Sequence, residues 1–169
     1  MATTQTEKAR RFRELHQRPG TFVIPNPWDV GAARLLALLG FEALATTSAG
    51  FAFTLGRKDG AVTREEAMAH CRLIVGASDL PVSADLENCF GDDPATVAET
   101  VRLAAGSGLV GCSVEDASGD ARRPIYEFAL AVERVAAAVE AARKLPFPFT
   151  LTARAENFLH GRQDLDDTV

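Results

Sequence analysis

Two carboxylates at alternate positions follow a short apolar run and have the chemistry to bind a divalent cation. Asp85 ends the β-strand expected at 81–85, and Glu87 comes two residues later. Side chains two apart on an extended chain point the same way. Like charges this close need a cation or a proton between them. Oxygen-only ligands suit Mg²⁺, which keeps several waters and takes one or two protein carboxylates. Solvated loop acids, or the cap of the next helix, are the alternative interpretation.

A second acidic pair follows the next apolar run. Glu115 ends the strand expected at 109–115, and Asp116 comes directly after it. If these strands are neighbours in a barrel, Glu115 converges with Asp85 and Glu87 at one edge of the sheet. Asp116 is a residue type that commonly forms turns or helix caps, so Glu115 is the stronger functional candidate.

Arg154 lies inside an apolar strand and needs a partner. The segment TLTARAEN places this guanidinium within the strand expected at 149–154. An arginine there must be paired with an acid or must face an anion. A salt bridge to Glu115 or Glu156 and binding of a substrate carboxylate both satisfy that requirement, and both can hold together.

Smaller polar residues follow the first two strands. The run TTSAG at 46–50 offers hydroxyls and a glycine that lets backbone N–H groups approach an anion, although such runs are also ordinary turn chemistry. Asp59 forms a turn with Gly60 on the plainer interpretation. Asn26 and Trp28 follow the first strand, where they close the mouth of the site or, for Trp28, join the core.

Strand and helix signals alternate along the chain. The strands are expected at 22–24, 43–48, 81–85, 109–115 and 149–154. Helices are expected at 1–18, 30–39, 63–77, 93–105, 124–144 and 164–169. Their starts carry recognisable caps: Asp29, the capping box of Thr63 with Glu66, and Asp93 followed by Pro94. A glycine-rich loop is expected between the second strand and the helix at 63–77.

This alternation predicts an α/β fold with a parallel sheet and right-handed crossovers. Polar residues at five different strand ends favour a (β/α)₈ TIM barrel over a doubly wound sheet, which concentrates its chemistry at one switch point. No G-x-G-x-x-G follows the first strand, so a dinucleotide site is unsupported. We expect a single domain at 1–169, in which the N-terminal helix at 1–18 precedes strands one to five at 19–169.

The number of strands raises an expectation about completeness. A full barrel needs about 250 residues, whereas 169 residues supply five of eight strands, so we expect a fragment or truncated barrel. Two unpaired strand edges and an uncovered inner face then invite association through those edges.

Composition excludes several other classes. The chain is 47% hydrophobic and carries 18 Lys and Arg against 23 Asp and Glu, a net charge of -5 that disfavours nucleic acid as a partner. No apolar run approaches the length of a membrane span, and the charged N-terminus does not resemble an export signal. Three cysteines without paired spacing fit small apolar residues in a reducing, cytoplasmic compartment. His16, His70 and His160 lack metal-ligand spacing, and no nucleophile elbow is present.

Five motifs, in order, resemble those of the isocitrate lyase and phosphoenolpyruvate mutase superfamily. The resemblance runs from about Phe12 to the last residue. The motifs are PNPWDVGAARLL, TTSAGFAFTLGRKDG, ADLENCFG, CSVED and TARAEN. The resemblance implies a (β/α)₈ barrel that binds Mg²⁺ and makes or breaks a C–C or P–C bond beside the carbonyl of a pyruvate-like unit. It also implies a homo-oligomer, commonly a tetramer.

The resemblance assigns roles to individual residues. Asp85 resembles the main metal carboxylate, and Glu87 and Glu115 resemble further acids that act on the metal mostly through water. Asp59 resembles the acid in the loop after the second strand, and Arg154 resembles the strand-five arginine that contacts substrate. Asp59, Glu115 and Arg154 are therefore the predicted catalytic residues. The segment that holds the substrate carboxylate and oxo group corresponds to Thr47, Ser48, Ala49 and Gly50.

One loop departs from the superfamily pattern. The lyases carry a Lys/Arg-Lys/Arg-Cys-Gly-His loop after the fourth strand, and the phosphonate enzymes place a Lys and an Asn there. Here the loop at 116–123 reads DASGDARR and holds none of these. Cys89 lies in another loop and Cys112 lies within a strand, so neither takes the role of the missing cysteine.

Three functions follow from these residues. The leading hypothesis is a Mg²⁺-dependent lyase or decarboxylase that acts on a 2-oxo or 2-hydroxy carboxylic acid through an enolpyruvate-type intermediate, as isocitrate and methylisocitrate lyases do. The second is a phosphonopyruvate-type mutase or hydrolase. The third is a catalytically inactive fragment that binds metal or oxo acids. In each case the expected partner is a small carboxylate, without nucleic acid or membrane.

Overall fold

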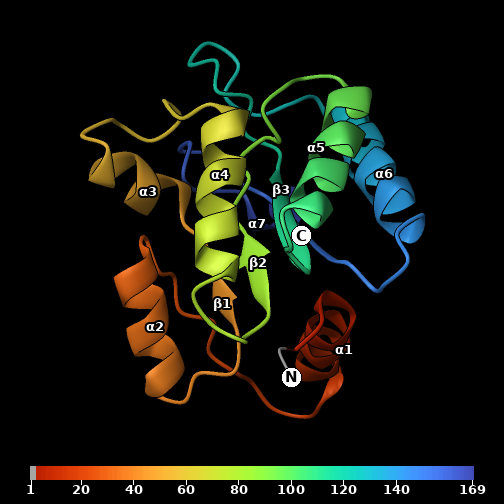
Figure 1. Ribbon diagram of the computed structural model, residues 1–169. Coiled ribbons are helices and arrows are strands. Elements are labelled where there is room, and N and C mark those ends of the chain that lie inside the picture. Colours follow the sequence, from red (N-terminus) through yellow and green to blue (C-terminus); the bar gives the residue numbers. More distant parts are fainter. Residues whose placement is uncertain (1–2) are drawn as a thin grey trace.

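The structure is a computed structural model that describes residues 3–169, and it shows a curved parallel sheet covered by helices (Figure 1). Its elements in chain order are α1 (Gln5–Gln17), α2 (Val30–Leu38), β1 (Leu44–Ala45), α3 (Ser48–Thr54), α4 (Arg64–Val75), β2 (Val82–Ala84), α5 (Pro94–Gly106), β3 (Gly111–Glu115), α6 (Phe128–Arg143), β4 (Thr150–Arg154) and α7 (Leu165–Thr168). Met1 and Ala2, which the expected helix at 1–18 included, lie outside the described residues.

The helix starts follow the local sequence signals. The Asp29 side chain accepts the N–H of Ala32 at the start of α2, at 2.7 Å. Both bonds of the capping box between Thr63 and Glu66 are formed at the start of α4. Asp93 caps α5, whose first residue is Pro94. These predictions are confirmed because each cap depends only on residues three apart in the chain.

The strands pair in sequence order. The sheet runs β1-β2-β3-β4, and every pair is parallel. Sequential parallel strands are the arrangement of a barrel, whereas a doubly wound sheet reverses its order at a switch point. The α/β prediction is therefore confirmed. The register of β3 and β4 sets Glu115 opposite Arg154 and Ser113 opposite Thr152.

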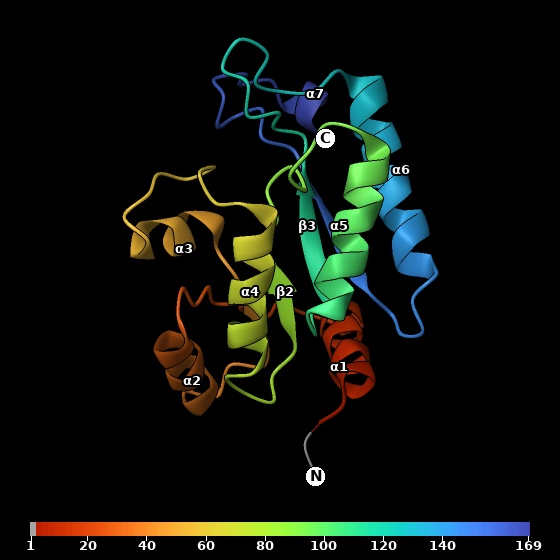
Figure 2. The same cartoon turned by 45° about the horizontal axis from the view of Figure 1, so that its top comes forward.

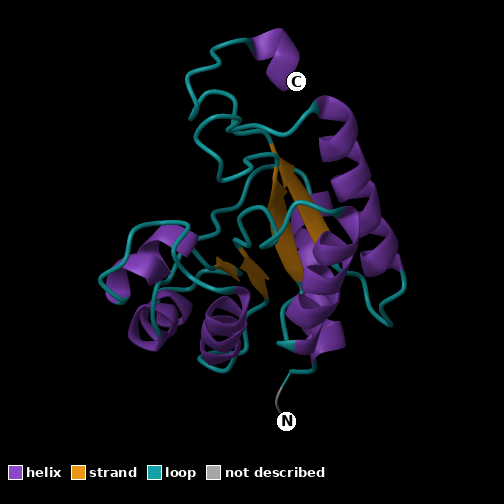
Figure 3. Cartoon of the chain, turned by 90° about the horizontal axis from the view of Figure 1, so that it is seen from above, coloured by secondary structure: helices purple, strands orange, loops and turns teal. Residues whose placement is uncertain are grey.

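Alternate strand residues face opposite sides of the sheet. Val82, Ala84, Cys112 and Val114 join the main core beneath α4, α5 and α6. Seen from above, the helices border the strands along the outer side, and loops lie over the inner side (Figure 3). Because side chains alternate, the other set, which includes Ser113 and Glu115, faces the inner side of the sheet.

Helix α1 closes the end of the sheet at which the strands begin (Figure 2). Phe12 and Leu15 form a second apolar cluster with Ala43 and Val110, which precede β1 and β3. A Cβ atom at Gly111 would lie 2.6 Å from the carbonyl oxygen of Thr150, so only glycine fits there. All strands therefore start from a packed base, and their carboxyl ends stay free for a site.

The prediction of a first strand at 22–24 is wrong. The segment does not pair with a neighbouring strand as a β-strand would, and Val23 is 68% exposed. The residue that follows this segment bonds to the sheet, as the N–H of Ala45 donates to the carbonyl of Pro25, at 3.1 Å. Pro25 and Pro27 have no N–H to donate, which limits further pairing.

Two other boundaries differ from the sequence prediction. The second strand was expected to reach residue 48, but β1 ends at Ala45, and α3 begins at Ser48 and occupies much of the segment that was predicted as a loop. Thr47 starts this helix early by accepting the N–H of Gly50, at 3.2 Å. The helix expected from residue 124 begins at Phe128, because Tyr126 donates its N–H to the carbonyl of Asp116 instead.

The cysteines are core residues, as their composition suggested. Cys71, Cys89 and Cys112 are free and buried. Burial raises the pKa of Cys71 and of Cys89 to about 12, so both thiols stay protonated at neutral pH. Within the part of the chain that the structure describes, no helix has the length and apolar character needed to cross a membrane.

Candidate active site

Asp85 is the point at which four segments meet, at the carboxyl end of β2. Its carboxylate accepts the backbone N–H of Ser48, at 3.0 Å, and the hydroxyl of Ser113, at 3.4 Å. The N–H of Glu87 also points at it, at 3.4 Å, and Arg154 reaches it from β4, at 3.2 Å. An acid held from the ends of successive strands is typical of a barrel active site.

Arg154 pairs with three carboxylates at once. Its Nη1 lies 2.6 Å from Glu115 and 3.2 Å from Asp85, and its Nη2 lies 2.7 Å from Glu156. The parallel register of β3 and β4 explains the shortest pair, because Glu115 stands directly opposite Arg154. The salt bridges that the sequence left open, to Glu115 and to Glu156, are both confirmed.

The cluster carries more negative than positive charge. Burial, with the nearby charges of Asp59 and Asp85, raises the pKa of Glu87 to about 7. Burial also raises the pKa of Glu115 to about 7, although Arg154 opposes that rise. Burial and the neighbouring acids both disfavour the ionised carboxylates, and Arg154 is the one cation paired with this cluster among the described residues. The site therefore has unused capacity for positive charge.

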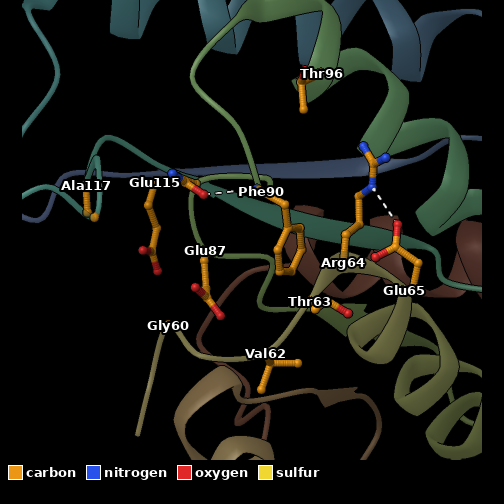
Figure 4. Close-up of a pocket in the computed structure, with 12 residues that line it drawn as sticks. Gly60, Val62, Thr63, Arg64, Glu65, Glu87, Phe90, Thr96, Glu115 and Ala117 are labelled. Carbon is orange, nitrogen blue, oxygen red and sulfur yellow. Dashed lines mark hydrogen bonds and ion pairs between the residues drawn. The ribbon is translucent and has the colours of Figure 1, made fainter.

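Glu87 and Glu115 point into one pocket of about 530 Å³ above the strand ends (Figure 4). Phe90 and Val62 supply apolar walls, and Arg64 lies across the pocket from the two acids. Such a pocket admits a small organic acid with few carbon atoms.

The predicted substrate segment forms the start of α3, beside Asp85. The N–H of Ser48 is bound to Asp85, while the N–H of Gly50 and the hydroxyl of Thr47 bind each other. A Cβ atom at Gly50 would lie 2.5 Å from Thr47 Cγ2, so this glycine is required for packing as well. The role of Thr47, Ser48, Ala49 and Gly50 in substrate binding stays a prediction.

Asp59 and Asp116 serve the surrounding loops. Asp59 accepts the N–H of Gly60, at 3.1 Å, which is the turn that its sequence suggested, and its charge acts on Glu87. Asp116 accepts the backbone N–H of Glu156, at 2.8 Å, and so ties the loops after β3 and β4 together. Asp116 is thus structural, whereas the catalytic role of Asp59 stays a prediction.

The sequence interpretation missed several residues that support the site. Thr46 accepts the N–H of Asp85, at 3.0 Å, and Ser113 donates to its carboxylate. Asn88 donates to the hydroxyl of Tyr126, at 3.1 Å, and so links the loops after β2 and β3. Ser113 could have been found from the sequence, because it lies two residues before Glu115 on the same strand and so faces the same side of the sheet. The contacts of Asn88 with Tyr126 depend on residues 38 apart and left no signal.

His70 is buried beside the site. Its burial should make the free energy of unfolding depend on pH. Its ring stacks on Phe51 at 3.9 Å, and its Nε2 lies 3.0 Å from the carbonyl of Trp28. Burial lowers its pKa below the usual 6.5, although Asp29 opposes this shift. Below about pH 6.5 the unfolded chain gains a proton that the folded chain resists, so this histidine favours folding less as pH falls.

We therefore expect the stability advantage of the wild type over His70→Gln to shrink as pH falls from about 7.5 to about 5.5. Urea unfolding at several pH values measures it. The exposed His160, changed to Gln, is the matched control for the loss of a histidine outside a buried site. An advantage that stays constant across this range contradicts the prediction.

The loop at 116–123 brings no acid or base into the pocket. Only Ala117 and Gly119 of this loop line it. Ser118 donates to the carbonyl of Arg123, and Asp120 pairs with the exposed Arg122, at 3.3 Å. The departure from the superfamily pattern therefore holds in space as well as in sequence.

The donors present fit a hard divalent cation better than a soft one. Asp85, Glu87 and Glu115 offer only oxygen, which suits Mg²⁺. Among residues 3–169, no three His, Cys, Asp or Glu side chains are grouped closely enough to hold an ion by themselves. Mg²⁺ commonly keeps several water ligands in proteins and needs few side chains.

Comparisons with known proteins agree with this geometry. The profile of the phosphoenolpyruvate phosphomutase family matches residues 12–169. The chain belongs to this family. A crystal structure from Burkholderia cenocepacia J2315, assigned no more finely than lyase or mutase, is 65% identical, with a TM-score of 0.95 over 97% of this chain and 59% of its own. Family membership supports a lyase or mutase in general terms.

Two further relatives have more specific names. The 2,3-dimethylmalate lyase of Eubacterium barkeri is 34% identical over 64% of this chain and 38% of its own. A phosphonopyruvate hydrolase, solved with oxalate and Mg²⁺, is 18% identical with a TM-score of 0.85 over 92% of this chain and 54% of its own, which shows a shared fold. The chain spans about half the length of curated relatives that it matches, 46% and 50% in two cases.

Proposed function

We propose that this chain carries the cation-binding and substrate-carboxylate-binding part of a Mg²⁺-dependent lyase or decarboxylase for a small 2-oxo or 2-hydroxy carboxylic acid. The observation that carries the proposal is a cluster of four carboxylates at the ends of adjacent strands, three of which pair with Arg154. Asp85, Glu87, Glu115 and Glu156 against one guanidinium leave three negative charges when all are ionised.

Different residues of the cluster would bind the cation and the substrate carboxylate. Asp85, Glu87 and Glu115 would hold the cation, mostly through its waters. When bound, Mg²⁺ supplies positive charge at the carbonyl oxygen of a 2-oxo acid, where negative charge develops as the neighbouring bond breaks. Arg154 binds a substrate carboxylate through its planar fork of donors. Ser48 contacts Asp85 from the start of α3, and Asp59 is a further acid whose charge acts on Glu87.

A direct assay tests this proposal. Oxaloacetate, 2,3-dimethylmalate and phosphonopyruvate, each with Mg²⁺, are incubated with the 169-residue chain, and pyruvate is measured with a coupled dehydrogenase. Phosphorus NMR follows the phosphonate, which covers a mutase or hydrolase. We expect Mg²⁺-dependent turnover of a carboxylic acid, lost in Asp85→Asn. Equal turnover by the variant contradicts the proposal.

A second candidate is binding of metal and oxo acid without turnover. The observation that favours it is the loop at 116–123, which gives the pocket only Ala117 and Gly119 and no proton donor. Heat denaturation with and without Mg²⁺ and oxalate separates the two, because a ligand that binds the folded state alone raises the melting temperature. Stabilisation without turnover of any tested acid favours the binder.

Association through the sheet edges also stays a proposal. Thr152 and Ala153 of β4 are exposed, and β4 pairs on one side only in the sheet order. An open edge of this kind recruits another strand. Light scattering of the 169-residue chain measures the assembly, and a stable monomer contradicts the expectation.

A further inference from the structure

Arg134 is the most deeply buried charged side chain among the described residues, with 1% of its surface exposed. It lies on α6, outside the pocket that holds Glu87 and Glu115. Its guanidinium donates to the carbonyl oxygens of Gly91, at 2.5 Å, and Asp92, at 2.6 Å, and also to that of Asn88. All hydrogen bonds of this buried arginine therefore go to backbone carbonyls of the loop after β2.

That loop, residues 86–92 after β2, has an unusual backbone. Glu87, Cys89 and Phe90 have φ angles of 52°, 60° and 63°, which place three non-glycine residues in the left-handed region. This region is sterically unfavourable for L-residues, because their Cβ atom lies close to the following carbonyl oxygen. Such a path persists only when the surrounding structure imposes it.

Donors from three elements impose it. The N–H of Glu115 on β3 binds the carbonyl of Glu87, at 3.0 Å. The hydroxyl of Thr100 on α5 binds the carbonyl of Cys89, at 2.9 Å. Arg134 on α6 donates to three more carbonyls of the loop, and its guanidinium stacks 4.2 Å from the ring of Tyr126. Without Arg134, three carbonyls of the loop would lose their donor.

The path of the loop decides where Glu87 points. In Figure 4 the Glu87 carboxylate enters the same pocket as that of Glu115, while Phe90 stands beside it as a wall. With an ordinary right-handed φ at Glu87, its Cβ would leave the backbone in a different direction. The position of this carboxylate therefore depends on contacts made by a helix that does not reach the pocket.

We propose that Arg134 is a positioning residue, which holds the loop 86–92 in its left-handed path and thereby aims Glu87 at the divalent cation. The inference rests on the proposed function for the cation and on the structure alone for the loop. Arg134 acts only through the backbone, so its loss should weaken cation binding without removing any ligand.

The test uses Arg134→Ala in the 169-residue chain, with two readouts. Hydrogen exchange of the amides at 86–92 is measured without metal, and Mg²⁺ affinity is measured by calorimetry. We expect loop exchange to rise at least 10-fold and Mg²⁺ affinity to fall about 10-fold, as when a supporting residue of a metal ligand is removed. Millimolar guanidinium, which fits the vacated space, should restore both, whereas urea at the same concentration should not. Arg102→Ala, an exposed arginine on α5, is the control and should change neither.

Each outcome decides one part. Unchanged loop exchange in Arg134→Ala, or unchanged Mg²⁺ affinity, overturns the positioning role. If the wild type itself binds no Mg²⁺, the proposed function fails, and the metal-free exchange result still decides whether Arg134 holds the loop. If Arg134→Ala does not fold, Arg134→Lys replaces it, since one ammonium cannot serve three carbonyls. Wild-type exchange and affinity in Arg134→Lys overturn the proposal.

Discussion

Changing Asp85 to Asn should lower Mg²⁺-dependent turnover by roughly 100-fold to 1,000-fold, the loss seen when one preorganised electrostatic group is removed from an active site. The amide keeps an oxygen for the N–H of Ser48, so the fold is retained. It loses the charge on which four segments converge. Pyruvate release and Mg²⁺ titration of the same preparation measure the effect.

The matched control for this variant lies at the other end of the same strand, before it begins. Asp79 precedes β2 and is exposed at the opposite end of the sheet, so Asp79→Asn removes the same charge far from the site. It should leave turnover and Mg²⁺ affinity at wild-type levels. Equal losses in the two variants would mean that the net charge of the protein, and not the position of Asp85, sets the activity.

Changing Arg154 to Met should weaken oxalate binding about 100-fold and also destabilise the fold. The oxalate effect follows from losing a charge-assisted, bidentate contact. The stability effect is expected at about 1–3 kcal/mol, below that of a fully buried pair, because Arg154 is 39% exposed and solvent screens its pairs. Calorimetry and urea unfolding measure the two quantities separately.

A double variant checks the physical reason. In Arg154→Met the carboxylates of Glu115, Asp85 and Glu156 lose their shared cation and repel one another. Adding Glu115→Gln removes one of these charges, so the double variant should be at least as stable as Arg154→Met alone. A further loss of stability equal to that of Glu115→Gln in the wild type would show that the pair is not coupled. Arg154→Lys should recover the binding only in part, since an ammonium lacks the planar fork.

The predicted features that the structure confirms are those in which neighbouring residues decide the outcome. Asp29, Thr63 and Asp93 begin helices because each side chain caps the N–H groups two or three residues ahead. The strand at 149–154 and the acids after the strands were visible for the same reason, since alternation and composition are local. The parallel sheet followed from the order of these elements.

Two predictions failed for different reasons. The segment 22–24 forms no strand, and the prolines that follow it, Pro25 and Pro27, offer no donors to β1. The helix expected from residue 124 starts at Phe128 because Asp116, which is not an immediate neighbour in the chain, accepts the N–H of Tyr126 through its backbone carbonyl. The pairing of Arg154 with three acids needed the register of β3 against β4, which no local pattern specifies.

The amino-acid sequence by itself determined the type of chemistry at the strand ends, the caps of the helices and the order of strands and helices. Only the tertiary structure decided which acids pair with Arg154. It also decided that Glu87, Cys89 and Phe90 adopt a left-handed backbone and that Arg134 donates to the carbonyls of their loop. The physical reason is range. Propensities and caps act over a few residues, whereas ion pairs and buried hydrogen bonds also join residues far apart in the chain, such as Arg134 with Asn88 at a separation of 46.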